Sequence, residues 1–237
     1  MTGRHSLSIV VPAYNEAGNI IGTLEAVTAA LDGLPLDAEI LVVDDGSVDE
    51  TRSLVERALP RFPAVRLLAN EWNLGFGATY RRGVQAAACE FVVMVHGDNA
   101  WGAETLRSFF SHVGDADIII GYTRDMWRSR PIGRTVLSKT FTALVNAVTG
   151  RRLRYYNGLQ IHRASILQAL TIQSSGYGFQ AEVLVKALRT ASTYIEVPME
   201  LREREHGESK AFRLKNAVDV ARTLRRLRAI AAEAPGR

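Results

Sequence analysis

The chain of 237 residues contains one cysteine, Cys89. A single cysteine excludes an internal disulfide and a cysteine-based zinc site, and the apolar residues 86–88 before it predict a place in the core. The sequence also lacks a run of about 18 apolar residues, which a membrane-spanning helix requires. Its first predicted strand begins at Leu7 without a charged and then apolar leader, so we expect a protein without a signal peptide.

Charge is ordinary in amount but uneven in position. The net charge of the whole chain is +4, and basic residues outnumber acidic ones between Leu201 and Arg228, so the remainder is close to neutral. Such a block indicates an anionic partner, such as a phosphate or a lipid headgroup, or else a solvated helix face. Because it lacks the aromatic interleaving of nucleic-acid-binding segments, we expect no nucleic acid partner.

Apolar segments that predict buried strands alternate with helical patterns in the first half of the chain. The predicted strands cover 7–11, 40–43, 65–69, 91–95 and 117–120, and the predicted helices cover 15–31, 77–88 and 104–112, with a further helix capped by Asp49. This alternation predicts an α/β fold with a single doubly wound, mostly parallel sheet flanked by helices.

Polar clusters follow three of the predicted strands. They are Pro12-Ala13-Tyr14-Asn15-Glu16, Asp44-Asp45-Gly46-Ser47 and His96-Gly97-Asp98-Asn99. In such sheets ligands bind beyond the carboxyl ends of the strands, so the clusters predict one shared site. The paired carboxylates can accept hydrogen bonds from a ribose or a base edge, and the small pair after them lets a ligand approach closely.

Asp98 is the strongest candidate metal ligand. A diphosphate needs its charge neutralised, and Mg²⁺ or Mn²⁺ does this with one or two carboxylates and the phosphate oxygens. His96 is the second candidate, although imidazole suits Mn²⁺ better than Mg²⁺. The alternative for His96 is a hydrogen-bonded histidine at a strand end.

The second half of the chain is basic and amphipathic. Residues 132–148 carry a helical apolar stripe with arginines at both ends, which indicates either a core helix or a helix in a membrane interface over 132–152. Residues 213–237 predict a basic amphipathic C-terminal helix and tail after a main domain of residues 1–212. Candidate phosphate-binding residues in this half and just before it are Arg124, Arg202, Arg204, Ser209 and Lys210.

Taken in order, these motifs resemble the family 2 glycosyltransferases of the GT-A fold, and within them the polyprenyl-phosphate (dolichyl-phosphate) sugar transferases. The matching segments are 9–16, 42–47 with Asp49 and Thr51, Asn73-x-Gly75 with Ala78 and Gly83, Gly97-Asp98, Gly121 with Arg124, Asn157-Gly158, and 207–210. They span residues 7–215. Two positions depart from the pattern: His96 replaces the first acid of the family's Asp-x-Asp, and Tyr155-Tyr156-Asn157-Gly158 lacks an acid before the glycine.

The resemblance implies a nucleoside diphosphate sugar as donor, a divalent cation, and a polyprenyl phosphate or other anionic acceptor. Residues 12–16, Asp44, Asp45, Gly46, Ser47 and Gly97 would hold the donor, Asp98 with His96 the metal, and Arg124, Arg202, Arg204, Ser209 and Lys210 the diphosphate or the acceptor. We therefore expect a cytoplasmic protein that lies peripherally on the inner face of the membrane.

The reaction implied by the resemblance is an in-line attack that inverts the anomeric carbon. Asp98, Arg124 and Glu182 are the candidate catalytic residues, with Glu182 or Asp98 acting as base if the acceptor is a hydroxyl. Glu182 could instead be a helix-surface acid. Three alternatives remain open: a hydroxyl acceptor on a glycan or small molecule, a degenerate nucleotide-sugar-binding protein, and a nucleotidyltransferase. The last lacks support because no Gly-rich, Lys-bearing loop follows the first strand.

Overall fold

The computed structural model describes residues 4–124, 132–174, 178–200 and 214–232. Within these ranges one seven-stranded sheet has the strand order β3-β2-β1-β4-β6-β5-β7. The strands are β1 (His5–Ala13), β2 (Leu36–Asp44), β3 (Val65–Ala69), β4 (Phe91–Met94), β5 (Ile118–Thr123), β6 (Gln160–Arg163) and β7 (Tyr194–Met199). Strand β6 runs antiparallel to both of its neighbours, and the other pairs are parallel. The predicted mostly parallel α/β sheet is confirmed, whereas β6 and β7 were not predicted.

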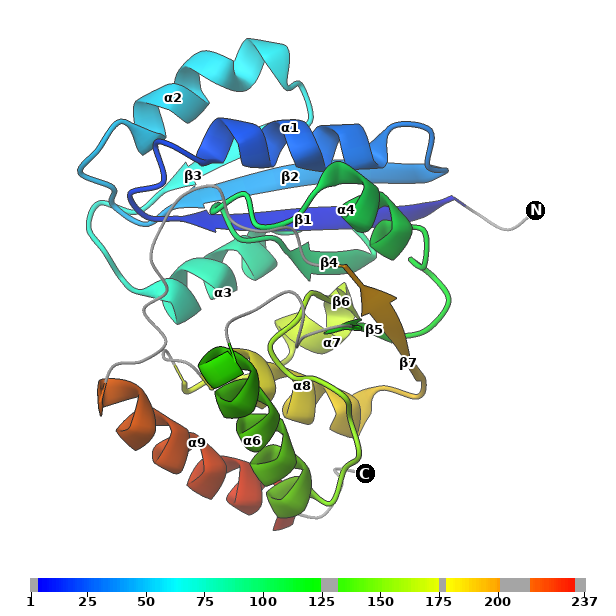
Figure 1. The fold of residues 1–237 in the computed structure, drawn as a ribbon. Coiled ribbons are helices and arrows are strands. Elements are labelled where there is room, and N and C mark those ends of the chain that lie inside the picture. Colours follow the sequence, from blue (N-terminus) through cyan, green and yellow to red (C-terminus); the bar gives the residue numbers. More distant parts are fainter. Residues whose placement is uncertain (1–3, 125–131, 175–177, 201–213, 233–237) are drawn as a thin grey trace.

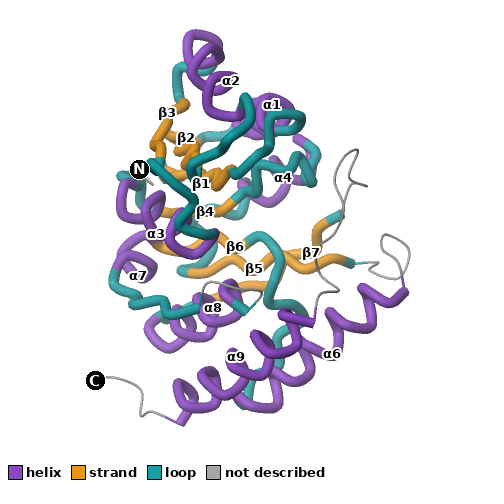
Figure 2. Tube along the Cα trace, turned by 90° about the vertical axis from the view of Figure 1, so that its left-hand side faces the viewer, coloured by secondary structure: helices purple, strands orange, loops and turns teal. Residues whose placement is uncertain are grey.

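Helices cover both faces of the sheet (Figure 1; Figure 2). They are α1 (Ile20–Leu31), α2 (Thr51–Ala58), the 3-10 turn η1 (Leu59–Arg61), α3 (Phe76–Ala86), α4 (Ala103–Phe110), α6 (Ile132–Thr149), α7 (Ala164–Gln168), α8 (Phe179–Thr190) and α9 (Leu214–Ala232). Helices α1, α2 and α4 lie over one face, and α3, α7 and α8 lie over the other. Helices α6 and α9 pack side by side beyond α8.

The strands are apolar on both faces because both faces are covered. Ile9 and Val11 pack in the core under α1 and α4, while Val10 between them belongs to the core under α3. This period-two division places every apolar residue of β1 in one of two cores. Cys89 is only half-buried, so the prediction that it lies in the core was wrong. It stands in the turn just before β4, where its N–H donates to Ser8 Oγ.

Helix α1 begins at Ile20, five residues later than predicted. Asn15 has a positive φ of 56°, which a helix does not accommodate. The N–H groups of Glu16 and Ala17 donate to Thr51 Oγ1 and Asp49 Oδ2 rather than along a helix. Residues 14–19 are therefore a loop at the carboxyl end of β1, held by side chains that follow β2.

Helix α3 packs closely on the sheet at Gly83. A Cβ at Gly83 would lie 2.3 Å from Val10 Cγ1 and 3.2 Å from Val43 Cγ2, both on buried, stiff β-branched side chains. Overpacking costs about 1–3 kcal/mol, and alanine's better helix propensity returns at most about 1 kcal/mol. We expect Gly83→Ala to lower the free energy of unfolding by roughly 1–2 kcal/mol in urea titration. Gly18→Ala is the matched control, because nothing lies within 4 Å of its added Cβ; an equal loss in both variants would contradict this explanation.

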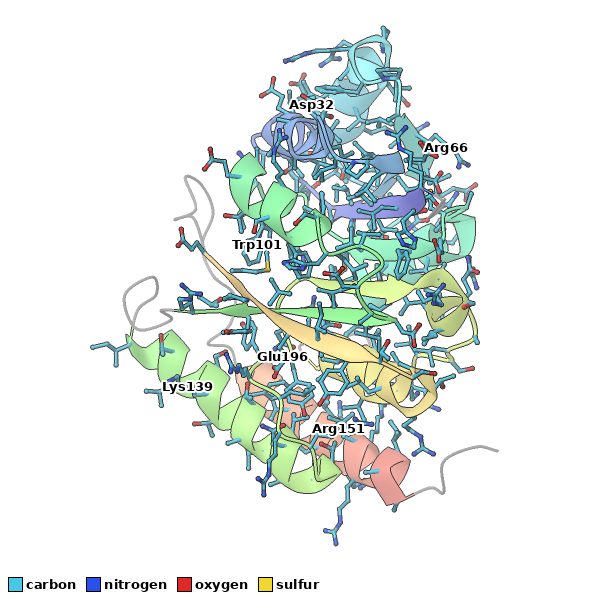
Figure 3. All side chains as sticks on the ribbon, turned by 90° about the vertical axis from the view of Figure 1, so that its right-hand side faces the viewer. Asp32, Arg66, Trp101, Lys139, Arg151 and Glu196 are labelled. Atoms are coloured by element: carbon cyan, nitrogen blue, oxygen red, sulfur yellow. The ribbon has the colours of Figure 1, made fainter. Side chains whose placement is uncertain are left out.

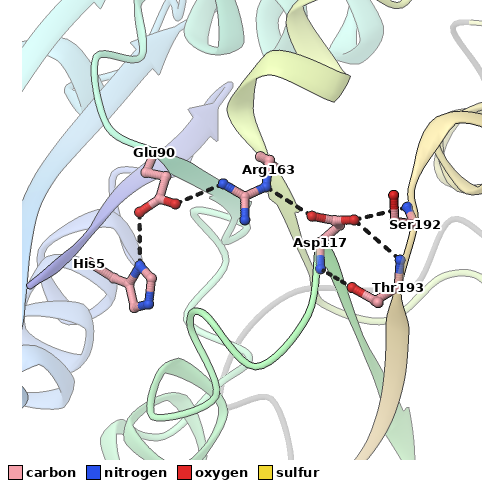
Figure 4. A network of polar contacts seen from close by, with 6 residues as sticks. All are labelled: His5, Glu90, Asp117, Arg163, Ser192 and Thr193. Atoms are coloured by element: carbon pink, nitrogen blue, oxygen red, sulfur yellow. Dashed lines mark hydrogen bonds and ion pairs between the residues drawn. The ribbon is translucent and has the colours of Figure 1, made fainter. Parts of the chain in front are cut away.

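A polar network joins strands at the end of the sheet opposite the loop 14–19 (Figure 4). Glu90 bonds His5 Nδ1 at 2.8 Å and Arg163 Nη1 at 2.7 Å, and Arg163 Nε bonds Asp117 Oδ1 at 2.9 Å. Asp117 Oδ2 in turn accepts the N–H groups of Ser192 and Thr193, the two residues before β7. The hydrogen bond with His5 lowers the pKa of Glu90, and that with Arg163 lowers the pKa of Asp117. The network connects five strands, β1, β4, β6, β5 and β7, at one end of the sheet.

Helix α6 has two apolar faces. Phe141 and Val145 are buried against α8 and α9. On the outer side the exposed fractions are 70% for Ile132, 48% for Val136 and 42% for Leu144. The single stripe predicted over 132–148 therefore divides into a core face and a solvent face. None of the described helices is both long enough and apolar enough to cross a bilayer.

Candidate functional site

A cleft of about 490 Å³ lies at the carboxyl ends of β1 and β4. The chain passes from β1 to β2 and β3 on one side and then returns to β4 on the other, so the strand order reverses between β1 and β4. Ligand sites of open α/β sheets form at such a reversal. Eight of the predicted site residues line this β1–β4 cleft: Pro12, Ala13, Tyr14, Glu16, Asp45, His96, Gly97 and Asp98.

Hydrogen bonds connect the loops after β1 and β2. Asn15 N donates to Ser47 Oγ at 3.0 Å, and Val48 N donates to Asn15 Oδ1 at 3.0 Å. Asn15 and Ser47 thus shape the cleft and do not line it. Tyr14, which directly follows β1, lines the cleft and is 43% exposed.

Asp44 and Asp45 have different surroundings. Both oxygens of Asp45 are occupied: Oδ1 accepts Asn70 Nδ2 at 2.8 Å and Leu74 N at 2.9 Å, and Oδ2 accepts Gly75 N at 2.9 Å. Asp45 therefore holds the loop after β3. Asp44 is buried, its Oδ2 accepts Ser47 N at 3.4 Å, and its Oδ1 has no partner among the described residues. A buried carboxylate oxygen without a donor is costly, so this atom can accept a hydrogen bond from water or from a ligand N–H or O–H.

Gly46 allows the loops after β2 and β3 to touch. Its φ is +67°, and a Cβ would lie 2.5 Å from the carbonyl carbon of Trp72. Only glycine accepts both conditions without moving backbone. The protein's own chain therefore makes the close approach at Gly46, and the approach of a ligand to Gly46 stays a prediction.

An aromatic stack lines the cleft and was not predicted from the sequence. The ring of Phe76, at the start of α3, lies 5.2 Å from that of His96 with an angle of 12° between their planes. Phe179 of α8 packs edge-on against Phe76 at 5.6 Å and against Tyr80 at 5.5 Å. Since these residues are far apart in the chain, no spacing in the sequence could have revealed the stack.

Glu182 and Arg124 do not line the β1–β4 cleft. Glu182 is 1% exposed and accepts hydrogen bonds from Gln173 N, Ser174 N and Lys186 Nζ, so it is not the helix-surface acid considered from the sequence. Arg124, at the end of β5, lines two other cavities. Arg202, Arg204, Ser209 and Lys210 lie outside the described residues.

Few side chains in the cleft could coordinate a metal ion. No cluster of three His, Cys, Asp or Glu side chains occurs among the residues that the structure describes. Asp98 and His96 nevertheless line the same cleft. One carboxylate with phosphate oxygens and water is an ordinary arrangement for Mg²⁺ or Mn²⁺, so these residues fit a metal that a ligand diphosphate helps to bind.

The profile of the family described as "Glycosyl transferase family 2" matches residues 8–167, more than half of the chain. This chain belongs to that family. The match runs from β1 through α7 and includes every residue that lines the β1–β4 cleft. The protein is therefore a glycosyltransferase, and the resemblance identified in the sequence is confirmed.

Curated relatives include polyprenyl-phosphate sugar transferases. Undecaprenyl-phosphate mannosyltransferase of Micrococcus luteus is 29% identical over 211 residues, which cover 85% of each chain. Dodecaprenyl-phosphate galacturonate synthase of Rhizobium johnstonii is 27% identical over 208 residues, 86% of this chain and 61% of the relative. This glycosyltransferase is thus similar in length to the first relative and spans about three fifths of the second.

Among solved structures, glucosyl-3-phosphoglycerate synthase of Mycobacterium tuberculosis shares the fold. Its complex with UDP matches with a TM-score of 0.71 and 19% identity, over 95% of this chain and 80% of that one. A complex of the same enzyme with Mn²⁺, UDP-glucose and phosphoglyceric acid matches with a TM-score of 0.72 and 20% identity, over the same shares. The predicted GT-A fold is confirmed.

Proposed function

We propose that this glycosyltransferase moves a sugar from a nucleoside diphosphate sugar, UDP- or GDP-linked, to polyprenyl phosphate at the inner surface of the membrane, with inversion at the anomeric carbon. The observation that carries the proposal is the β1–β4 cleft, which gathers Tyr14, Glu16, His96 and Asp98 at the reversal of the strand order. The names of the curated relatives, which act on undecaprenyl or dodecaprenyl phosphate, support the acceptor.

The nucleoside would lie against the loops after β1 and β2. Pro12 and Tyr14 offer apolar surface for a base, and the unpartnered Oδ1 of Asp44 suits a base N–H or a ribose hydroxyl. Asp45 acts indirectly, since it fixes the loop after β3 that closes one side of the cleft. Gly97 has no side chain to fill the space next to Pro12 and Ala13, where a Cβ would lie 3.2 Å from Pro12 O.

The diphosphate would lie toward Asp98 and His96, which would hold Mg²⁺ or Mn²⁺. The cation supplies charge neutralisation to the diphosphate. Phe76 restrains the imidazole of His96 by stacking on its face. Arg124, Arg202, Arg204, Ser209 and Lys210 remain candidates for the acceptor phosphate or the leaving diphosphate.

The surroundings of Glu182 favour an ionised acceptor. A hydroxyl acceptor needs a base beside the donor sugar, and the carboxylate of Glu182 is occupied by Gln173, Ser174 and Lys186 outside the cleft. A phosphate acceptor already carries negative charge at neutral pH. Its oxygen attacks the anomeric carbon as the bond to the nucleoside diphosphate breaks, and this single displacement inverts the configuration.

The outer face of α6 supports a peripheral place on the membrane. Ile132, Val136 and Leu144 project from it into solvent. A helix with an apolar outer face and basic flanks is typical of an interfacial helix.

A donor screen tests the proposal. Purified protein is mixed with UDP- and GDP-sugars, with and without Mn²⁺ or Mg²⁺, and we expect one donor to raise the melting temperature in a metal-dependent way. Addition of polyprenyl phosphate should then release the nucleoside diphosphate. Release with a glycan hydroxyl but not with polyprenyl phosphate would favour the hydroxyl-acceptor alternative, and binding without any release would favour a degenerate binding protein.

A further inference from the structure

Helix α9 has no role in the donor and acceptor chemistry proposed above. It follows the part of the chain that the family profile matches, residues 8–167. Its buried residues Leu227 and Ile230 share a core with residues of α6 and α8. Figure 3 shows α9 beside α6, with side chains filling the space between these helices and α8. Through α8, the contacts of α9 reach the β1–β4 cleft.

Two residues of α9 contact the chain near the start of α8. Arg226 Nη1 donates to Ser174 Oγ at 3.1 Å. Thr223 is buried and packs closely on Gly178, the residue before α8, since a Cβ at Gly178 would lie within 2.6 Å of three Thr223 atoms. Thr223 and Arg226 are three residues apart and therefore lie on one side of the helix. Helix α9 thus holds both Ser174 and Gly178.

Ser174 is also held by α8 and α3. Its N–H donates to Glu182 Oε2 at 2.9 Å, and its carbonyl oxygen lies against the start of α3, where a Cβ at Gly77 would be 3.0 Å from it. Ser174 is 8% exposed. Because a close-packed interior leaves no free space, a shift of Ser174 must be passed to the residues that contact it.

Aromatic rings continue these contacts into the β1–β4 cleft. Phe179, the first residue of α8, directly follows Gly178 and is 1% exposed. Its ring packs edge-on against Phe76 at 5.6 Å, and a Cβ at Gly77 would lie 3.3 Å from two of its carbons. Phe76 lines the cleft and stacks on His96. An unbroken series of direct contacts therefore runs from α9 to the floor of the donor site.

We propose that Thr223 and Arg226 are positioning residues, through which α9 fixes the ring of Phe76 in the cleft. The inference rests on the donor site proposed above and adds a remote helix to it. A wall that is already fixed loses less conformational entropy when the donor binds, so the contacts of α9 raise donor affinity. Coupling of this kind is reciprocal, and bound donor must in turn stabilise the packing of α9.

Proton NMR of the full chain, without donor or metal and at one pH, tests the positioning directly. The ring of Phe76 shifts the resonances of the stacked His96 imidazole, and His96→Gln identifies these resonances. Arg226→Ala combined with Thr223→Ala should move them toward the positions of an unstacked histidine. Arg225→Ala is the matched control and should leave them unchanged, because Arg225 is exposed on the same helix and makes none of the contacts above.

Donor affinity gives a second measurement. Arg226→Ala should raise the Kd of the sugar nucleotide that the wild type binds about fivefold, with a melting temperature close to that of the wild type. Arg226→Lys keeps a donor for Ser174 Oγ and should recover most of the affinity. Ser174→Ala should raise the Kd to the same extent as Arg226→Ala, and the two changes together should add nothing, because both remove one hydrogen bond.

Several results would overturn the inference. Unchanged His96 resonances in the double variant of α9 would show that the aromatic stack does not depend on this helix. An equal loss of donor affinity in Arg225→Ala would indicate a general effect of charge. If the wild type and every variant bind the donor equally, the positioning role fails and the proposed transferase function stands. If the wild type binds no donor, the proposed function fails, and the His96 resonances still decide whether α9 positions Phe76.

Discussion

Replacing Asp98 with alanine is expected to lower metal-dependent release of the nucleoside diphosphate by two to three orders of magnitude, about 100- to 1000-fold. Asp98 lines the β1–β4 cleft at the end of β4, where the diphosphate would lie. Asp45 lines the same cleft, but three hydrogen bonds already occupy its oxygens. Release measured with saturating donor, polyprenyl phosphate and Mn²⁺ checks this prediction.

Two further variants test whether the effect of Asp98→Ala comes from the loss of a metal ligand. Asp37→Ala removes an exposed carboxylate that pairs with Arg4 at the far end of β2, and it should keep release within about twofold. His96→Asp restores the family's acid pair and should improve metal-dependent stabilisation by Mg²⁺ relative to Mn²⁺. If Asp98→Ala released the nucleoside diphosphate at the wild-type rate and kept its melting temperature, Asp98 would not be a metal ligand.

Glu182→Ala is expected to lower the free energy of unfolding by about 3–5 kcal/mol. The substitution leaves the N–H groups of Gln173 and Ser174 without an acceptor and the partly buried Lys186 without its partner at 2.6 Å. Burial by itself raises the pKa of Glu182, but the hydrogen bonds from Lys186, Ser174 and Gln173 together outweigh it and hold the pKa below its ordinary value of 4.5. Urea titration measures the loss.

The pH dependence of that loss has a definite sign. Because the folded-state pKa of Glu182 is lower than the unfolded one, its contribution is full above about pH 4.5 and is lost as the pH falls through the folded-state value. The difference between wild type and Glu182→Ala should therefore shrink in acid. Glu56→Ala, which breaks an exposed pair with Arg52, should cost less than about 1 kcal/mol. Wild-type stability with lost transferase activity in Glu182→Gln would instead make Glu182 a catalytic base.

The first half of the fold could be predicted because its physical signals are local. Apolar runs such as 40–43 are buried strands. The polar residues that follow the strands, Asp45 and His96 among them, line one cleft because parallel strands finish at the same end of the sheet. The alignment of three polar clusters with three strand ends was enough to predict the cleft before the structure located it.

What could not be predicted depends on contacts between distant segments. Strand β6 is four residues long and alternates apolar Ile161 with polar Gln160 and His162, yet both polar residues are buried. Gln160 donates to Tyr156 O and contacts His162 Nε2, so these side chains are paired within the core. Burial lowers the pKa of His162 to about 3, and it is neutral at physiological pH. The exposed and buried faces of α6 likewise follow from packing on α8 and α9.

The antiparallel strand in the middle of the sheet also constrains how the chain folds. Among the described strands β5 pairs only with β6 and β7, and both are synthesised after α6. Until Gln160–Arg163 has been synthesised, one edge of β4 is unpaired and β5 has no strand to pair with. Unpaired strand edges promote aggregation with other chains. Such non-local pairing slows folding. Helix α6, with its apolar outer face, is therefore synthesised while the sheet is still divided, and β5 joins the rest of the sheet only through one short strand, β6, between it and β4.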